Sequence, residues 1–279
     1  MESGPLWQVP VTVRVSDLLR RNERVRGLWL AGSLAHGDAD RLSDIDFVVA
    51  VDDHDLVEPA TMLETALARE FEIVLLRHRG FERFRLLNLV TVEWERLDFS
   101  LYPAAAIAES PLRGLRPLFD KDEIGDHVEE SSVPAIPPTA DQVDHTLTEF
   151  ARVLGLLPVV MNRGDLVGAI AGSGLLREHL VALFRYELVD KPARGALNET
   201  AQLTSEGAKV LVGLPPLAAN RTSILGFSWA CLAAFLETGP RVADRYGVEW
   251  PGRLVDALHA QLAREFGDEF GVHRDSVAG

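Results

Sequence analysis

Residues 28–50 read LWLAGSLAHGDADRLSDIDFVVA. One apolar run ends at Gly32 and Ser33, a polar segment follows, and a second apolar run begins with the acid pair Asp44 and Asp46. Apolar runs of this length, separated by small and polar residues, predict a strand, a loop and a second strand. Residues i and i+2 of a strand point to the same face, so we expect the two carboxylates to converge.

This pattern predicts a site for a nucleotide and a metal ion. Two carboxylates held close together repel each other, and a hard divalent cation such as Mg²⁺ relieves the repulsion while taking oxygen ligands. Gly32 lets the backbone approach a phosphate without a side chain in the way, and Ser33 adds a hydroxyl group beside exposed backbone N–H groups.

The order Gly32-Ser33, ten intervening residues, Asp44-x-Asp46 and a further apolar run resembles the signature of the polymerase-beta-like nucleotidyltransferase superfamily. The resemblance implies that Gly32 and Ser33 hold a nucleoside triphosphate and that Asp44 and Asp46 bind catalytic magnesium. It also implies a third carboxylate on a later strand. Ser43 is a further candidate nucleotide-binding residue.

The candidate for the third carboxylate is Asp98. Leu97, Phe99 and Leu101 alternate with polar residues, which predicts a strand with Asp98 on its polar face. Glu93 is the alternative, because it also follows an apolar run. We favour Asp98, since the matched pattern has its third acid inside a strand flanked by core residues; its role as a metal ligand or as a general base stays open.

The composition indicates a soluble globular protein of two domains. Its 279 residues are 47% hydrophobic, and no apolar run approaches the roughly 18 residues of a membrane span. The net charge of −14 argues against a duplex or tRNA substrate and favours a cationic acceptor. The single cysteine, Cys231, excludes an internal disulfide and is expected in a buried helix. Without an export signal at the N-terminus, we expect a cytoplasmic location.

The chain is predicted to have an α+β fold: a nucleotidyltransferase domain with a mixed sheet flanked by helices, followed by a helical bundle. The expected boundaries are 1–125 for the catalytic domain, 126–139 for a linker rich in proline, and 140–279 for the helical, acceptor-binding domain. In the first domain we expect helices over 16–24 and 59–71, strands over 25–31 and 72–76, a basic loop over 77–83, and two strands within 84–102. In the second, helical spacing predicts helices over 140–162, 165–188, 222–246 and 252–266. Pro158 predicts a kink or an early stop in the first of these, Thr222 is a candidate N-cap of the third, and Gly239-Pro240 predicts a break within the third.

A catalytic domain followed by a helical bundle looks like the antibiotic nucleotidyltransferases, which adenylylate hydroxyl groups of aminoglycosides or lincosamides. The resemblance implies transfer of a nucleoside monophosphate, with AMP from ATP as the first expectation, to a small-molecule hydroxyl by a two-magnesium mechanism. Antibiotic resistance is the role that the resemblance suggests; whether it is the physiological role, and whether the chain is a monomer or a homodimer, stays open. Three other hypotheses remain. They are an antitoxin-like protein adenylyltransferase, a nuclease-like helical half on the evidence of Arg253 and His259, and a nucleotide-binding protein without catalysis.

Overall fold

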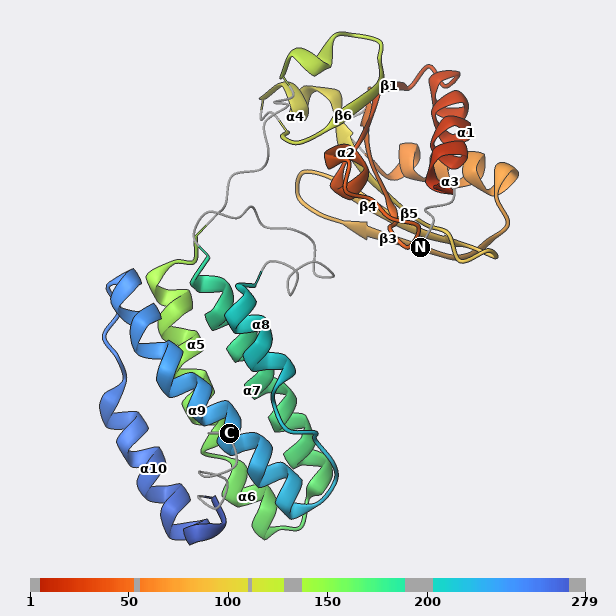
Figure 1. Ribbon diagram of the computed structural model, residues 1–279. Helices are drawn as coiled ribbons and strands as arrows, with labels where there is room; N and C mark the ends of the chain where they lie inside the picture. The colour runs from red at the N-terminus through yellow and green to blue at the C-terminus, as the bar shows by residue number, and fades with distance from the viewer. Residues whose placement is uncertain (1–5, 53–55, 110–111, 128–136, 189–202, 271–279) are drawn as a thin grey trace. The chain divides into compact units, whose positions relative to one another are not determined.

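The computed structural model describes residues 6–52, 56–109, 112–127, 137–188 and 203–270 (Figure 1). The chain divides into two compact units, Met1–Val133 and Pro134–Gly279, and each is described by itself. The predicted linker contains the point of division, although residues 128–136 lie outside the described part of the chain. The boundaries at 125 and 139 stay a prediction.

The N-terminal unit is built on one six-stranded mixed sheet with the strand order β3-β4-β5-β2-β1-β6. Only β2 and β5 of these strands run parallel; the other neighbours are antiparallel. The mixed sheet and its helices confirm the predicted fold class. The strands are β1 (Val25–Leu30), β2 (Ile45–Val51), β3 (Ile73–Gly80), β4 (Arg85–Thr91), β5 (Arg96–Pro103) and β6 (Arg116–Asp120). The helices are α1 (Gln8–Arg20), α2 (Gly32–His36), α3 (Val57–Glu70), α4 (Ala104–Glu109) and the 3₁₀ helix η1 (Ile124–His127).

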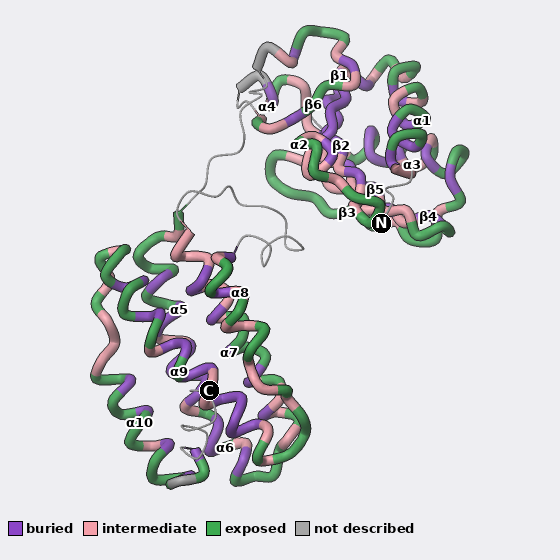
Figure 2. Tube along the Cα trace, viewed as in Figure 1, coloured by how far each residue is buried: buried purple, intermediate pink, exposed green. Residues whose placement is uncertain are grey.

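The two faces of this sheet differ in what they bury. Odd-numbered residues of β2 and β5, such as Phe47 and Phe99, whose rings stack with centroids 4.9 Å apart, belong to the core shared with α1 and α3. Figure 2 colours the buried positions along these strands and helices purple. The opposite face carries a smaller apolar cluster that includes Ile107 of α4 and Ile124 of η1. Because side chains alternate along a strand, Asp46 and Asp98 lie on this second face.

Three local predictions for the N-terminal unit were wrong. The first helix begins at Gln8 rather than after Ser16, because Val11, Val15 and Leu19 form one buried stripe that extends the helix toward the N-terminus. The expected loop after β1 contains the short helix α2. The predicted basic loop over 77–83 is in part strand, since β3 continues to Gly80 and pairs with β4 along its whole length.

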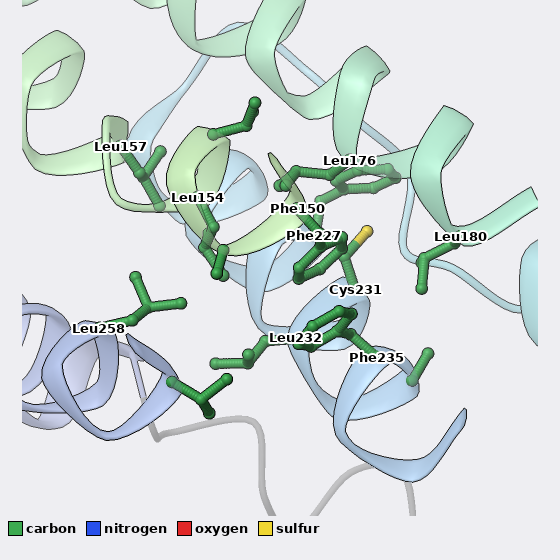
Figure 3. Packing of buried hydrophobic residues seen from close by; sticks show 14 of the residues in the cluster. Phe150, Leu154, Leu157, Leu176, Leu180, Phe227, Cys231, Leu232, Phe235 and Leu258 are labelled. Atoms are coloured by element: carbon green, nitrogen blue, oxygen red, sulfur yellow. The ribbon is translucent and has the colours of Figure 1, made fainter. Parts of the chain in front are cut away.

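The C-terminal unit is a bundle of α-helices around a core of its own. It contains α5 (Ala140–Leu154), α6 (Leu157–Asn162), α7 (Leu166–Tyr186), α8 (Ser205–Val212), α9 (Arg221–Tyr246), α10 (Gly252–Phe266) and the 3₁₀ helix η4 (Gly267–Phe270). Figure 3 shows the centre of this core, where the rings of Phe150 and Phe235 stack 4.1 Å apart, with Cys231 buried on α9. Burial raises the pKa of the Cys231 thiol to about 12, so this cysteine is a packing residue.

The structure also corrects several helix boundaries in this unit. The segment predicted over 140–162 is divided into α5 and α6, with Pro158 in the first turn of α6, which confirms the kink or early stop predicted at this proline. The cap of α9 is Asn220 rather than the predicted Thr222, and α9 continues through Pro240, where a break was expected. Among the described helices, α7 alone is long and apolar enough to pass for a membrane span, but it packs against α5, α6 and α9 within the bundle.

Candidate active site

The sheet register brings two of the predicted acids together. Asp46 of β2 lies directly opposite Asp98 of β5 in the parallel pair. Adjacent strands are about 4.8 Å apart, so the two carboxylates start from neighbouring positions on the same face. Asp44 precedes β2 by one residue, and its charge acts on both Asp46 and Asp98. The three predicted acids therefore form one cluster at the end of the only parallel strand pair among the described strands.

The electrostatics of the cluster are those of carboxylates crowded in a partly buried place. Burial, and then the charges of Asp44 and Asp98, raise the pKa of Asp46 from 3.8 to about 6. Burial also raises the pKa of Asp98, while a hydrogen bond from Asn88 and the charge of Arg96 oppose the rise. An excess of negative charge held in this way is stabilised by a bound cation.

Gly32 lies against this cluster and has two reasons to be glycine. Its φ of +59° is in the left-handed region, and a Cβ atom at this position would lie 2.2 Å from Oδ2 of Asp46. The neighbouring residue Ala31 donates its backbone N–H to the carbonyl oxygen of Asp46, at 2.8 Å. The start of α2 and the second acid are thus held together by the backbone as well as by close packing.

Ser33 and Ser43, the two serines predicted to bind nucleotide, have different surroundings in the structure. Ser33 is the second residue of α2, whose first N–H groups have no partner within the helix and whose N-cap residue provides no side-chain cap. His36 is directed back into this helix, with Nδ1 2.6 Å from the carbonyl oxygen of Gly32. The Ser43 hydroxyl accepts a hydrogen bond from the N–H of Asp40, at 3.0 Å, so it closes its own turn. Ser33 follows Gly32, which packs against the acid cluster, whereas the Ser43 hydroxyl forms a hydrogen bond within the turn that precedes Asp44.

Glu93, the alternative third acid, is not part of the cluster. It lies in the turn between β4 and β5, is exposed, and precedes Trp94, which has a φ of +65° and is 75% exposed. This turn and the segment before Asp44 line a groove of about 570 Å³ that includes Trp7 and Glu93. The acids of the cluster do not line this groove. The geometry therefore places Asp98, and not Glu93, beside Asp46.

Sequence reasoning missed two residues that contact the cluster. Nη1 of Arg96 lies 3.7 Å from Oδ2 of Asp44, with both side chains about one-third exposed. The Asn88 side chain donates a hydrogen bond to the Asp98 carboxylate from the facing position on β4. The available signal for Asn88 was a lone polar residue within the apolar run of β4. No local pattern marks Arg96, because its partner is far away in the sequence.

The donor set of the cluster consists of hard carboxylate oxygens, which suits Mg²⁺. As the side chains are placed, with Asp44 paired to Arg96, no group of three or more His, Cys, Asp or Glu residues in the described ranges is arranged to hold a metal ion. A cation would therefore require these side chains to reorient.

Comparison with known proteins bears on the N-terminal unit. Residues 14–87 match the family model "Polymerase beta, Nucleotidyltransferase", a segment that contains β1, α2 and β2 and ends within β4. The match confirms the recognition of a polymerase-beta-like nucleotidyltransferase domain. The search of curated proteins gives no match.

Several solved structures resemble the chain at low sequence identity. An aminoglycoside 6-adenyltransferase from Bacillus subtilis is 14% identical with a TM-score of 0.44, and the alignment covers 90% of this chain and 95% of that one. A nucleotidyltransferase-like protein from Exiguobacterium sibiricum is 11% identical with a TM-score of 0.28 and coverages of 97% and 91%. Terminal uridylyl transferase 4 from Trypanosoma brucei with bound GTP is 14% identical with a TM-score of 0.29 and coverages of 81% and 69%. Likenesses at these values carry no argument about substrate.

Proposed function

We propose that this chain, whose N-terminal unit carries a nucleotidyltransferase domain of the polymerase-beta type, transfers a nucleoside monophosphate from a nucleoside triphosphate to a hydroxyl group. The observation that carries the proposal is the convergence of Asp44, Asp46 and Asp98 beside the glycine that begins α2. ATP is the proposed donor and a small molecule the proposed acceptor. Gly32 and Ser33 are the proposed contacts of the triphosphate.

The negative charge of the three acids suits the binding of divalent cations. Asp44, Asp46 and Asp98 would hold two magnesium ions, which when bound would neutralise the phosphates and polarise the α-phosphate. The raised pKa values of Asp46 and Asp98, caused first by burial and then in part by the neighbouring carboxylates, support this assignment, because a bound cation would stabilise the charged form of each acid. Arg96 contacts Asp44 directly, and this ion pair compensates for part of the charge of Asp44.

The strand order supports an assignment of the two sides of the reaction. An in-line displacement places the entering and the leaving oxygen on opposite sides of the phosphorus atom. The short helix α2 follows β1, on one side of Asp46, while Asp98 belongs to β5, on the other side. We therefore assign the leaving pyrophosphate to the side of Gly32 and Ser33, and the acceptor to the side of Asp98.

In the proposed reaction the acceptor oxygen forms a new bond to the α-phosphorus, and the bond from this phosphorus to the bridging oxygen of pyrophosphate breaks. The hydroxyl proton passes to a carboxylate oxygen of Asp98 and then to solvent. Asn88 keeps the Asp98 carboxylate oriented through its hydrogen bond. Pyrophosphate leaves with the electron pair of the broken bond.

The acceptor class is proposed from the net charge of the chain and from the helical unit that follows its catalytic unit. A chain with a net charge of −14 attracts cationic molecules, and an aminoglycoside is a polycation with several hydroxyl groups. Lincosamides, which also offer hydroxyl groups, are the second class, and antibiotic resistance would be the role in either case. The helical unit is proposed to contribute to acceptor binding. Because ATP and magnesium are abundant in the cytoplasm, we propose that location.

The test is transfer of label from α-labelled ATP and, separately, α-labelled GTP, in magnesium, to aminoglycosides and lincosamides offered singly. The Asp46→Asn variant gives the background, because it removes a ligand charge with little change of size. The Asp17→Asn variant, which changes an exposed acid on α1, controls for loss of one negative charge. Transfer by the wild type and by Asp17→Asn, but not by Asp46→Asn, is the expected result.

Other outcomes would replace the proposal in defined ways. Label that enters a protein rather than a small molecule would indicate a protein adenylyltransferase. Nucleotide that binds without any transfer to any acceptor would indicate a non-catalytic binding protein. Transfer by Asp46→Asn at the wild-type rate would remove Asp46 from the reaction.

A further inference from the structure

A short turn, residues 40–43, connects the loop after α2 to the first acid of the cluster. The N–H of Ser43 donates to the carbonyl oxygen of Asp40 at 3.2 Å, and the N–H of Leu42 donates to Oδ1 of Asp40 at 2.7 Å. Asp44 follows immediately. The position of this turn therefore determines where the backbone enters β2, and with it the positions of the Asp44 and Asp46 carboxylates.

Gln8, the first residue of α1, holds both ends of this turn. Its side-chain nitrogen, Nε2, donates to the carbonyl oxygen of Asp40 at 2.7 Å and to that of Ser43 at 2.8 Å. These contacts bridge 32 and 35 residues of sequence. Both N–H groups of the amide are thus used on the turn.

The two remaining carbonyl groups of the turn are also held by side chains. The indole N–H of Trp7 donates to the carbonyl oxygen of Arg41 at 2.9 Å, and Nη2 of Arg96 donates to that of Leu42 at 2.8 Å. The other terminal nitrogen of the same guanidinium group is the one that faces Asp44. All four carbonyl groups of residues 40–43 therefore accept a side-chain hydrogen bond, and the arginine connects the turn to the acids.

The burial of Gln8 makes a space-filling role a poor explanation of this residue. Gln8 is 0% exposed, and its Oε1 is buried without a hydrogen-bond partner among the described residues. A buried amide with one unsatisfied polar atom is destabilising relative to an apolar side chain of the same size. The two N–H groups are what a methionine or leucine at this position would lack.

We infer that Gln8 is a positioning residue for the acid cluster: with support from Trp7 and Arg96, it fixes residues 40–43 and so presents Asp44 and Asp46 in a set geometry. This inference deepens the proposed function and rests on it for its effect on cation binding. The fixed turn itself is a property of the chain with or without a bound cation. Residues that orient metal ligands from behind commonly change metal affinity by about 10- to 100-fold when they are replaced.

The test uses the full-length chain and two independent readouts. The main variant is Gln8→Met, which keeps the volume and removes both donors, and Trp7→Phe is a milder variant that removes only the indole donor. Val15→Ala is the matched control, because it truncates a buried residue of the same helix that faces the core and not the turn. Amide hydrogen exchange is read on peptides that cover residues 38–47, and Mn²⁺ binding is measured by titration without nucleotide.

We expect Gln8→Met to speed exchange in residues 40–44 by about tenfold, as the loss of one to two hydrogen bonds implies. We expect Mn²⁺ affinity to fall by about 10-fold or more, with a smaller change for Trp7→Phe and less than about twofold for Val15→Ala. Unchanged exchange in the turn of folded Gln8→Met, or an equal loss of Mn²⁺ affinity in Val15→Ala at equal thermal stability, would overturn the inference. Failure of the wild type to bind Mn²⁺ would instead overturn the proposed function, while the exchange readout still decides whether Gln8 fixes the turn.

Discussion

Replacing Asp46 by asparagine is expected to make the metal-free protein more stable at alkaline pH while it removes activity. The Asp46 carboxylate is partly buried beside Asp44 and Asp98, and its pKa is raised from 3.8 to about 6. An acid whose pKa is higher in the folded state contributes stability below pH 3.8, and this contribution is lost as the pH rises through about 6. Above pH 6 the charged carboxylate therefore destabilises the N-terminal unit.

The pKa difference sets the size of the effect. At 1.36 kcal/mol for each pKa unit, a rise from 3.8 to about 6 corresponds to about 3 kcal/mol at pH 8. At pH 4, where the folded wild type is protonated at Asp46, the same relation leaves less than about 1 kcal/mol. Asp46→Asn should therefore exceed the wild type in free energy of unfolding by up to about 3 kcal/mol at pH 8 in a metal chelator, and by much less at pH 4.

The assay is urea unfolding detected by hydrogen exchange on peptides from β2 and β5, which reports the N-terminal unit separately from the helical unit. Asp17→Asn should stay within about 0.5 kcal/mol of the wild type at both pH values, as exposed substitutions usually do. Added Mg²⁺ should narrow or reverse the gap, because it stabilises the wild type through the carboxylates that the variant lacks. A variant that is no more stable than the wild type at pH 8, or whose gain is the same at pH 4, would refute the reasoning.

Three further predictions concern the same site. Gly32→Ala should leave a soluble protein with transfer activity reduced at least about 100-fold, since it forces an alanine into φ +59° and against the Asp46 carboxylate; a rate assay beside circular dichroism checks it. Asn88→Leu should move the acid limb of the pH–rate profile to higher pH, because loss of its hydrogen bond raises the pKa of Asp98 further, and an unmoved limb would contradict this. Removal of divalent cations by a chelator should abolish transfer by the wild type, and Mg²⁺ or Mn²⁺ should restore it to the wild type but not to Asp46→Asn, as measured with labelled nucleotide.

Local sequence patterns predicted much of the scaffold of this site. The alternation around Asp98, the apolar run that ends at Gly32 and the apolar run that follows Asp46 were sufficient to expect the strands that pair as β1, β2 and β5. Parallel pairing of β2 and β5 brings Asp46 and Asp98 together, and a two-residue spacing places Asp44 on the same face. The strands and the shared face of Asp44 and Asp46 could be predicted because their patterns lie within a few residues of each acid, whereas the parallel pairing of β2 with β5 joins distant segments and was not predicted.

The residues that the sequence did not reveal act over long distances along the chain. Gln8 contacts a turn more than 30 residues away, and Arg96 reaches Leu42 across 54 residues. Neither belongs to a periodic pattern that marks its partner. Tertiary packing also overrode a local signal in α9, which continues through Pro240, while Gly239 lies so close to the ring of Trp250 that a Cβ there would be 2.5 Å from it.

The measurement we would make first is anomalous diffraction from crystals of the wild type grown with Mn²⁺ and a non-hydrolysable ATP analogue. We expect manganese peaks within coordination distance of Asp44, Asp46 and Asp98, with the triphosphate against Gly32 and Ser33, and no such peaks in Asp46→Asn crystals. Nucleotide bound elsewhere, or manganese absent from these three carboxylates in the presence of bound nucleotide, would contradict the assignment of the cluster as the catalytic site.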